Sequence, residues 1–293
     1  MKPRHLILMI VMNFFWGGSY STFKALASQL DAGGLATLRF GIAALILLAA
    51  WPWLPGRAPR GRDLLLTVLM GVIVFVVAPR LQVAGVQRGQ AGDAAVLIAL
   101  EPLITSLGAG LFLRENIGPR RWMGFCLGLA GVVLMAQVWR PDFHLPNLTA
   151  NALFVASFVC EAVYSVLGKP LIQRASLMKI LALALAAGAL VNCGMDGRAT
   201  WAAAQHLTPG AWGLLAYLAI ICTLVGYVVW FVVIRETEVN VTVLTVFIQP
   251  VVGVLIATLV LKEALHWGQL WGSLAIVAGL VVALSRQIKR PGR

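Results

Sequence analysis

Long apolar runs separated by short polar breaks dominate the chain. Ten of these runs have about 20 residues, the length that a helix needs to cross the hydrocarbon core of a bilayer. The breaks carry turn-forming residues, as in RPDFHLPN at 140–147 and MDGRAT at 195–200. The pattern predicts ten membrane-spanning helices, at residues 6–27, 35–54, 64–86, 92–113, 120–138, 149–168, 177–195, 210–234, 239–261 and 267–285.

The composition agrees with an all-α integral membrane protein that lies in a lipid bilayer. Hydrophobic residues make up 60% of the 293 residues, charged residues make up 12%, and the mean hydropathy is +0.88. Soluble domains average roughly 45–50% apolar and about 25% charged residues. The net charge of +12 could suggest a nucleic-acid partner. The charges lie in short loops rather than on one amphipathic face, so we expect no nucleic-acid binding.

The distribution of Lys and Arg orients the predicted helices. If the N-terminus is cytoplasmic, 16 of the 23 basic residues fall at cytoplasmic ends and four in outer loops, while Lys24, Arg39 and Arg80 lie inside spans. Cytoplasmic loops of membrane proteins carry an excess of Lys and Arg. Both termini are therefore predicted to be cytoplasmic, which requires an even number of spans.

The chain contains an internal repeat. A shift of 148 residues aligns 75–135 with 223–283 without a gap, and it pairs Pro102 with Pro250. Each repeat unit has five predicted spans, and because five is odd the second copy must run inverted in the bilayer.

The repeat divides one integrated transmembrane domain into a first half, 1–138, and a second, inverted half, 139–293. Inverted repeats are typical of alternating-access carriers, which bind substrate between the repeats near the middle of the membrane. We therefore predict a transporter of a small-molecule substrate. A duplicated scaffold that does not transport is the alternative.

Several apolar motifs resemble a known family. They are FFWGGSYSTFK at 14–24, LRF at 38–40, AAVLIALEPLITSLGAGLFLRE at 94–115 followed by GLAGVVL, and IQPVVGVLIATLVLKE at 248–263 followed by WGSLAIVAGLVV. Over nearly the whole chain they resemble the EamA family of the drug/metabolite transporter superfamily. The resemblance implies a ten-helix exporter of small metabolites, frequently amino acids, in the bacterial inner membrane. It is greatest for exporters of aromatic and other neutral amino acids.

The chain lacks the motifs of several other activities. It contains no GxxxxGK[ST] sequence for an ATP-driven pump, and no HExxH or GxSxG sequence for a hydrolase. The four histidines are scattered, and the four cysteines lack metal-site spacing. We expect no enzymatic activity, no metal and no cofactor. A multidrug or nucleotide-sugar carrier remains an alternative function, and the choice between monomer and dimer stays open.

An acidic residue, Glu101, is predicted at mid-membrane, where a charge costs a few kcal/mol and usually marks function. Its candidate partner is Arg80 in the preceding span. Glu101 could form a structural ion pair or hydrogen bond, bind a substrate ammonium, or carry a coupled proton. The shift of 148 residues pairs it with the neutral Gln249, which argues against a coupling role common to both halves.

Two further charges lie within predicted spans. Glu161 has no obvious cationic partner, so it either is structural or faces an aqueous cavity. Arg39 could pair with Asp31 or line the outer vestibule.

Pro102 and Pro250 each remove a backbone hydrogen bond within a predicted span. Because they occupy symmetric positions, we predict that both are hinges for alternating access, with packing kinks as the alternative.

Aromatic and polar side chains gather on predicted interior faces. Asn13, Trp16 and Tyr20 share one helix face, since they are three and seven residues apart. Aromatic rings can stack on an apolar side chain or attract an ammonium group, although Trp and Tyr also anchor membrane interfaces. The predicted substrate cavity consists of Asn13, Trp16, Tyr20, Arg80, Gln82, Glu101, Tyr164, Tyr227, Trp230 and Gln249.

Overall fold

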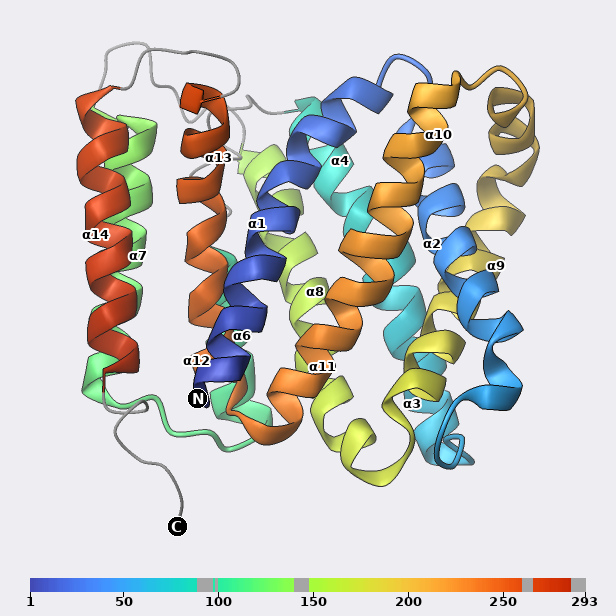
Figure 1. The fold of residues 1–293 in the computed structure, drawn as a ribbon, viewed down its shortest axis with the longest axis horizontal. Coiled ribbons are helices and arrows are strands. Elements are labelled where there is room, and N and C mark those ends of the chain that lie inside the picture. Colours follow the sequence, from blue (N-terminus) through green and yellow to red (C-terminus); the bar gives the residue numbers. More distant parts are fainter. Residues whose placement is uncertain (89–96, 98–99, 140–147, 260–265, 286–293) are drawn as a thin grey trace.

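Helices running between two ends of a bundle form the protein (Figure 1). The computed structural model describes residues 1–88, 97, 100–139, 148–259 and 266–285, and this part contains helices and no strand. The α-helices are α1 (Pro3–Leu26), α2 (Ala32–Ala49), α3 (Arg62–Val72), α4 (Ala78–Arg88), α6 (Leu100–Phe112), α7 (Pro119–Ala136), α8 (Leu148–Arg174), α9 (Leu177–Ala204), α10 (Pro209–Ala216), α11 (Gly226–Glu236), α12 (Val239–Thr242), α13 (Ile248–Leu259) and α14 (Trp267–Leu284).

Six of the described helical stretches are long and apolar enough to cross a membrane, and two shorter apolar ones accompany them. The six comprise Ala32–Ala49, Arg62–Gly85, Leu148–Arg174, Leu177–Ala204, Pro209–Glu236 and Trp267–Leu284; the shorter ones are Leu100–Phe112 and Val239–Val252. An all-helical membrane protein is therefore confirmed, whereas ten inverted spans remain a prediction.

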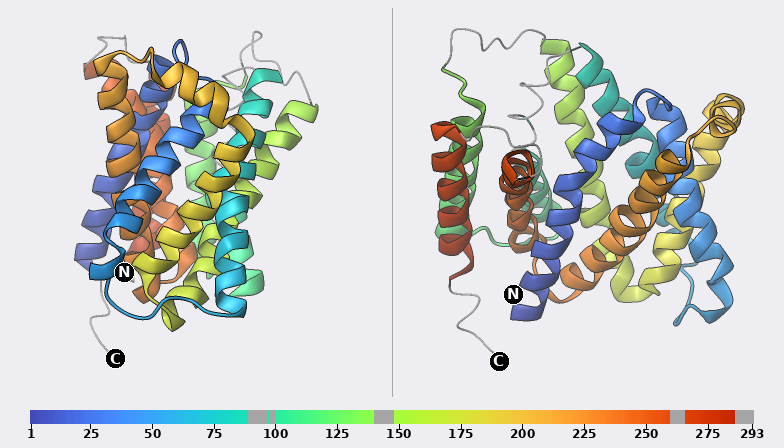
Figure 2. Two further views of the ribbon diagram at one scale, coloured as in Figure 1. Left: turned by 90° about the vertical axis from the view of Figure 1, so that its right-hand side faces the viewer. Right: turned by 45° about the horizontal axis from the view of Figure 1, so that its top comes forward.

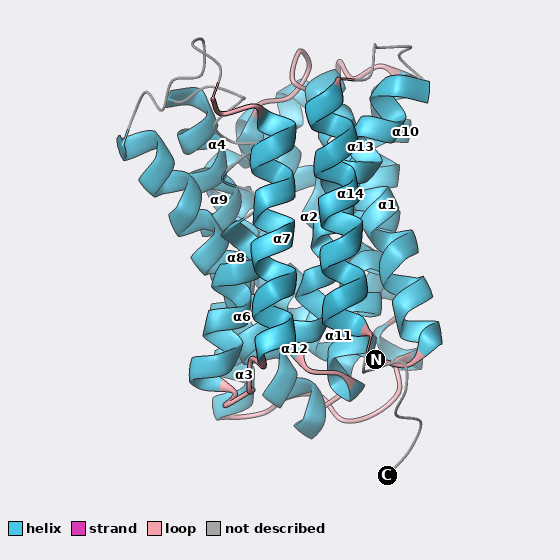
Figure 3. Cartoon of the chain, turned by 90° about the vertical axis from the view of Figure 1, so that its left-hand side faces the viewer, coloured by secondary structure: helices cyan, strands magenta, loops and turns pink. Residues whose placement is uncertain are grey.

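Helices α7 and α14 lie side by side at one edge of the bundle (Figures 1 and 3). Their contact depends on glycine. A Cβ atom on Gly131 would lie 2.6 Å from the carbonyl oxygen of Gly272, and one on Gly279 would lie 3.0 Å from that of Gly124. Small residues allow helix backbones to approach closely in a membrane, where the hydrophobic effect does not drive helices together.

The other helices pair across the two halves of the chain. Helix α2 lies along α9 at the opposite edge (Figures 1 and 2), α4 and α6 pack against α8, and α1 packs against α11 and α13. The buried apolar core lies between these pairs and includes Phe75, Tyr164 and Phe231. The inner faces of α1, α2, α8 and α11 thus surround the centre of the bundle.

Two helices contain wide π-helical turns. The first, η2 (Ile73–Val77), joins α3 to α4, and the second, η3 (Tyr217–Val225), joins α10 to α11. The shift of 148 residues places 73–77 on 221–225, within η3. Such turns occur frequently at functional sites, because they disturb the regular helical hydrogen bonds.

One predicted break is wrong. Residues 195–200 were expected to form a turn, but α9 continues without interruption to Ala204. Asp196 therefore lies on a helix, where its carboxylate forms an ion pair with Arg80 of α4. This tertiary contact favours helix at a sequence whose local composition is typical of a turn.

The N-terminus lies at one end of the bundle, which we call the basal end (Figure 1). A buried carboxylate joins several segments there. Glu115, after α6, is 6% exposed and forms an ion pair of 2.7 Å with Lys169 of α8. It also accepts hydrogen bonds from the backbone amides of Val239 (2.9 Å) and Asn240 (3.0 Å) and from the Asn240 side chain (2.9 Å). Glu115 thereby caps the start of α12.

Arg121 of α7 extends this arrangement. Its guanidinium forms an ion pair with Glu238 and donates hydrogen bonds to Asn240 Oδ1 (2.6 Å) and the carbonyl of Asn116 (2.7 Å). The Glu115 network, consisting of Glu115, Arg121, Lys169, Glu238 and Asn240, joins the α6–α7 connection of the first half to α8 and α12 of the second.

Candidate binding site at the centre of the bundle

Two predicted site residues meet where α1 contacts α13. Asn13 is fully buried, and its Oδ1 accepts a hydrogen bond of 3.0 Å from Gln249 Nε2. Its Nδ2 donates to the carbonyl of Met9 (2.8 Å) and to Thr245 Oγ1 (3.1 Å). Asn13 is thus held from several sides, and half-buried Gln249 is positioned by it.

A pair of tryptophans lies nearby. The rings of Trp16 and Trp230 lie 6.0 Å apart between centroids. Trp16 Nε1 donates to the carbonyl of Cys222 in η3 (2.8 Å), and Trp230 Nε1 donates to Ser165 Oγ of α8 (2.9 Å). Each indole has its polar atom satisfied; Trp230 is buried, and half-buried Trp16 retains some accessible apolar surface.

Tyr164 and Tyr227 belong to one aromatic group. Their rings are 4.8 Å apart, and the Tyr164 hydroxyl donates to the Tyr227 carbonyl (3.2 Å). Phe75 of η2 contacts Tyr227 at 5.3 Å and Phe40 of α2 at 4.9 Å, and Phe231 stacks on Tyr164 at 4.2 Å. This group connects α2, α8 and α11.

Three charged side chains lie beside these rings, and we call them the Arg39 cluster: Arg39 of α2, Glu161 of α8 and Glu101 of α6. Glu161 interacts electrostatically with both Arg39 and Glu101. All three are half-buried. Arg39 Nε donates to Thr223 Oγ1 of η3 (2.7 Å). Within the described part of the chain, neither glutamate has a hydrogen bond or an ion pair, and Arg39 has no ion pair.

The predicted pairing of Arg80 with Glu101 is wrong. Arg80 binds Asp196 and also donates a hydrogen bond of 2.9 Å to Asn192 Oδ1, so it joins α4 to α9 instead. The proposed pairing of Arg39 with Asp31 is wrong as well, because Asp31 caps α2 by accepting a hydrogen bond of 2.7 Å from the Gly34 amide.

Other predicted residues stay untested. Gln82 is half-buried and forms no hydrogen bond within the described residues. The side chain of Tyr20 lies outside the described part. Pro102 lies in α6 and Pro250 in α13, and their action as hinges stays a prediction.

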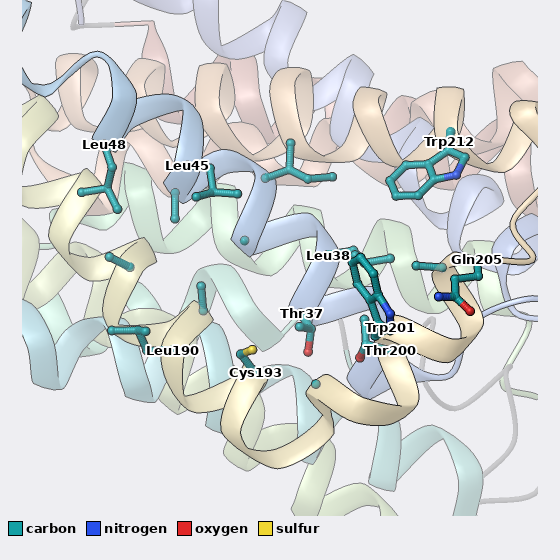
Figure 4. Close-up of a pocket in the computed structure, with 17 residues that line it drawn as sticks. Thr37, Leu38, Leu45, Leu48, Leu190, Cys193, Thr200, Trp201, Gln205 and Trp212 are labelled. Carbon is teal, nitrogen blue, oxygen red and sulfur yellow. The ribbon is translucent and has the colours of Figure 1, made fainter.

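A groove of about 620 Å³ opens between α2, α9 and α10, away from these residues (Figure 4). Leu45, Leu190, Trp201 and Trp212 contribute its apolar lining. Leu45 and Leu190 are largely exposed. The apolar surface suits contact with acyl chains in a bilayer. The charged side chain of α2 does not line this groove, because Arg39 lies on a different face of the helix from Leu38, Gly41 and the other groove residues.

The described residues bring together no three His, Cys, Asp or Glu side chains that could hold a metal ion. What the centre offers is an aromatic surface beside charged groups of both signs, an arrangement suited to recognition of an amphiphilic small molecule.

Sequence reasoning missed Thr223 as the partner of Arg39, and Arg39 as the neighbour of Glu161. The available signal was the presence of opposite charges inside the second and sixth predicted spans. Because these spans are not consecutive, their order in the chain does not indicate that they are neighbours.

Comparison with known proteins identifies the class of protein. The EamA-like transporter family matches twice, over residues 4–137 and 148–285. An uncharacterized transporter of Archaeoglobus fulgidus is 25% identical over 97% of this chain and 98% of its own length. A probable terminal-alkyne amino-acid exporter of Streptantibioticus cattleyicolor is 25% identical over 98% of this chain and 97% of its own length. One solved crystal structure has a TM-score of 0.75 at 18% identity over 98% of both chains, which shows a common fold.

Proposed function

We propose, from the premise that the chain belongs to the EamA-like transporter family, that it is a secondary transporter exporting neutral and aromatic amino acids or similar small metabolites. We place it in the bacterial inner membrane. Family membership and the names of relatives indicate a transporter rather than an enzyme.

The architecture that we propose is ten spans in two inverted five-helix repeats, 1–138 and 139–293. Two separate matches to the family, one in each half, support it. The helix contacts support it too, because α8 packs against α4 and α6 as α1 packs against α11 and α13. With ten spans, the charge distribution favours cytoplasmic termini and hence a cytoplasmic basal end.

The observation that carries the proposed substrate class is the centre of the bundle, where aromatic rings from both halves surround mid-helix polar groups. Trp16 and Phe75 come from the first half, and Trp230 and Tyr227 from the second. Rings of this kind suit an apolar or aromatic side chain. The name of the amino-acid exporter among the relatives favours the same class.

Alternating access would require the basal end to open and close around this centre. The Glu115 network supports a closed basal end, since it joins segments of both halves through a buried carboxylate. Pro102 and Pro250 are the proposed hinges.

Flux of radiolabelled amino acids into proteoliposomes tests the proposal. We expect exchange of phenylalanine and leucine above the level of protein-free vesicles, and little flux of a nucleotide sugar or a cationic drug. Flux of either control compound without flux of any amino acid would reject the substrate class. A protein that moves no solute would favour the scaffold instead.

A further inference from the structure

The Arg39 cluster places opposite charges among apolar rings. Charged side chains inside a membrane protein are costly unless partners, water or a ligand satisfy them. Glu101 and Glu161 have no hydrogen bond within the described part of the chain, yet both are accessible enough to be only half-buried. The two carboxylates repel each other when both are ionised. The cluster is therefore suited to accept a positive group.

Arg39 has a defined orientation. Its Nε atom donates to Thr223 Oγ1 at 2.7 Å, and the guanidinium lies 5.2 Å from the Phe40 ring centroid and 5.5 Å from that of Phe23. Since Nε is the atom bound, the two terminal nitrogens can still donate to a ligand. A guanidinium presents a planar pair of donors that matches a carboxylate.

Glu161 interacts electrostatically with both Arg39 and Glu101, and α8, which carries Glu161, packs against α6, which carries Glu101. A carboxylate only accepts hydrogen bonds, and an ammonium group only donates them. A ligand with neighbouring carboxylate and ammonium groups would thus complement Arg39 and the two glutamates together.

Aromatic rings adjoin the same charges. Phe40, next to Arg39 in the chain, contacts Phe75, which in turn contacts Tyr227. Tyr227 also interacts electrostatically with Arg39, Glu161 and Glu101. Phe40 and Phe75 are buried and support Tyr227, which is half-buried, so an apolar side chain attached to the charged groups of the ligand would meet Tyr227.

We propose that the Arg39 cluster binds the charged backbone of an α-amino acid, with Arg39 binding the carboxylate and Glu161 and Glu101 binding the ammonium. Thr223 is a positioning residue for Arg39. This inference rests on the proposed function and deepens it, since it assigns the two charges of the substrate to named side chains.

The test is competition against exchange of radiolabelled L-phenylalanine in proteoliposomes. One competitor is L-phenylalaninamide, which keeps the ammonium and lacks the carboxylate; the other is 3-phenylpropanoate, which keeps the carboxylate and lacks the ammonium. We expect each to compete at least about tenfold more weakly than L-phenylalanine, since each loses a charge-assisted hydrogen-bonded contact.

The variants separate the two contacts. In Arg39→Gln, the inhibition constants of the amide and of phenylalanine should become similar. In Glu161→Gln, the inhibition constants of 3-phenylpropanoate and of phenylalanine should become similar. Arg198→Gln, an exposed arginine of α9, is the matched control and should keep the wild-type ratios. Ratios within one variant do not depend on the amount of folded protein, and Arg39→Lys gives a charge-conserving check if Arg39→Gln is unstable.

The outcomes distinguish the inference from the proposed function. Wild-type protein that exchanges phenylalanine, with competitor ratios unchanged in both cluster variants, would overturn the inference and leave the amino-acid transporter standing. Equal competition by the amide, the acid and phenylalanine in wild type would overturn it too. Absence of exchange for every amino acid would reject the proposed function, and the inference with it.

Discussion

Replacing Glu115 by alanine will destabilise the protein more than removing any exposed ion pair at the basal end. The Glu115 carboxylate accepts four hydrogen bonds, from Lys169 Nζ, two backbone amides of α12 and one side-chain amide, at 2.7–3.0 Å. With 6% of its surface exposed, water cannot readily replace it. The variant leaves these donors without their acceptor, and Lys169 without its counter-ion.

The magnitude follows from this geometry. Removing one partner of a buried ion pair costs about 3–5 kcal/mol, because the other charge is stranded. Lys169 is 21% exposed and also donates to the Thr237 carbonyl at 2.8 Å, so partial solvation lowers the cost. We expect a loss of about 3 kcal/mol in the free energy of unfolding. Glu115→Gln retains one acceptor and should lose less.

The assay is reversible unfolding in mixed detergent micelles, followed by tryptophan fluorescence. The matched control is Arg174→Ala, which removes the Arg174–Asp63 pair at the same end, where the Arg174 side chain is 63% exposed. Exposed pairs contribute about 0–1 kcal/mol. If Glu115→Ala destabilises no more than the control, the Glu115 network does not hold the basal end together, and the reasoning from burial fails.

Three further predictions follow from the described contacts. A double-mutant cycle on Arg80→Ala and Asp196→Ala should give a coupling of about 2 kcal/mol in the free energy of unfolding, and additive losses would contradict the ion pair. Gly272→Ala should cost about 1–3 kcal/mol, because a Cβ atom there meets the backbone of α7; Gly213→Ala, with open space around it, should cost nothing measurable. Pro250→Ala should slow phenylalanine exchange without lowering unfolding stability if the residue is a hinge, and an unchanged exchange rate would favour the packing kink.

The apolar runs predicted the described helices well, because a bilayer requires about 20 apolar residues in a spanning helix whatever their order. The error at 195–200 has a different origin. Asp196 and Gly197 are typical of a turn, but the ion pair of Asp196 with Arg80 stabilises a helical conformation that the local sequence disfavours. Only the fold brings these two residues together.

The sequence indicates which polar side chains lie within the predicted spans, but not which contacts they form. Asn13 and Gln249 were both expected at the centre, and they form a hydrogen bond. Helical periodicity gives the face on which a side chain lies, but not the helix that it meets. For this reason Arg80 was assigned to Glu101, whereas Arg39, from a span that is distant in sequence, is the cation near the acidic pair.

The two π-helical turns explain how a repeated scaffold can offer unlike surfaces to one ligand. The shift of 148 residues places Phe75 of η2 on Thr223 of η3. In η2 the Phe75 carbonyl accepts a hydrogen bond of 2.9 Å from Asn192, and in η3 the carbonyl preceding Thr223 accepts one of 2.8 Å from Trp16. In both halves, a backbone carbonyl of the wide turn accepts a hydrogen bond from a neighbouring helix, at positions that differ by one residue under the shift. The side chains differ: Thr223 orients Arg39, while Phe75 packs in the aromatic core against Tyr227. This asymmetry gives the proposed site one charged side and one apolar side, which matches the division of an α-amino acid with an apolar side chain.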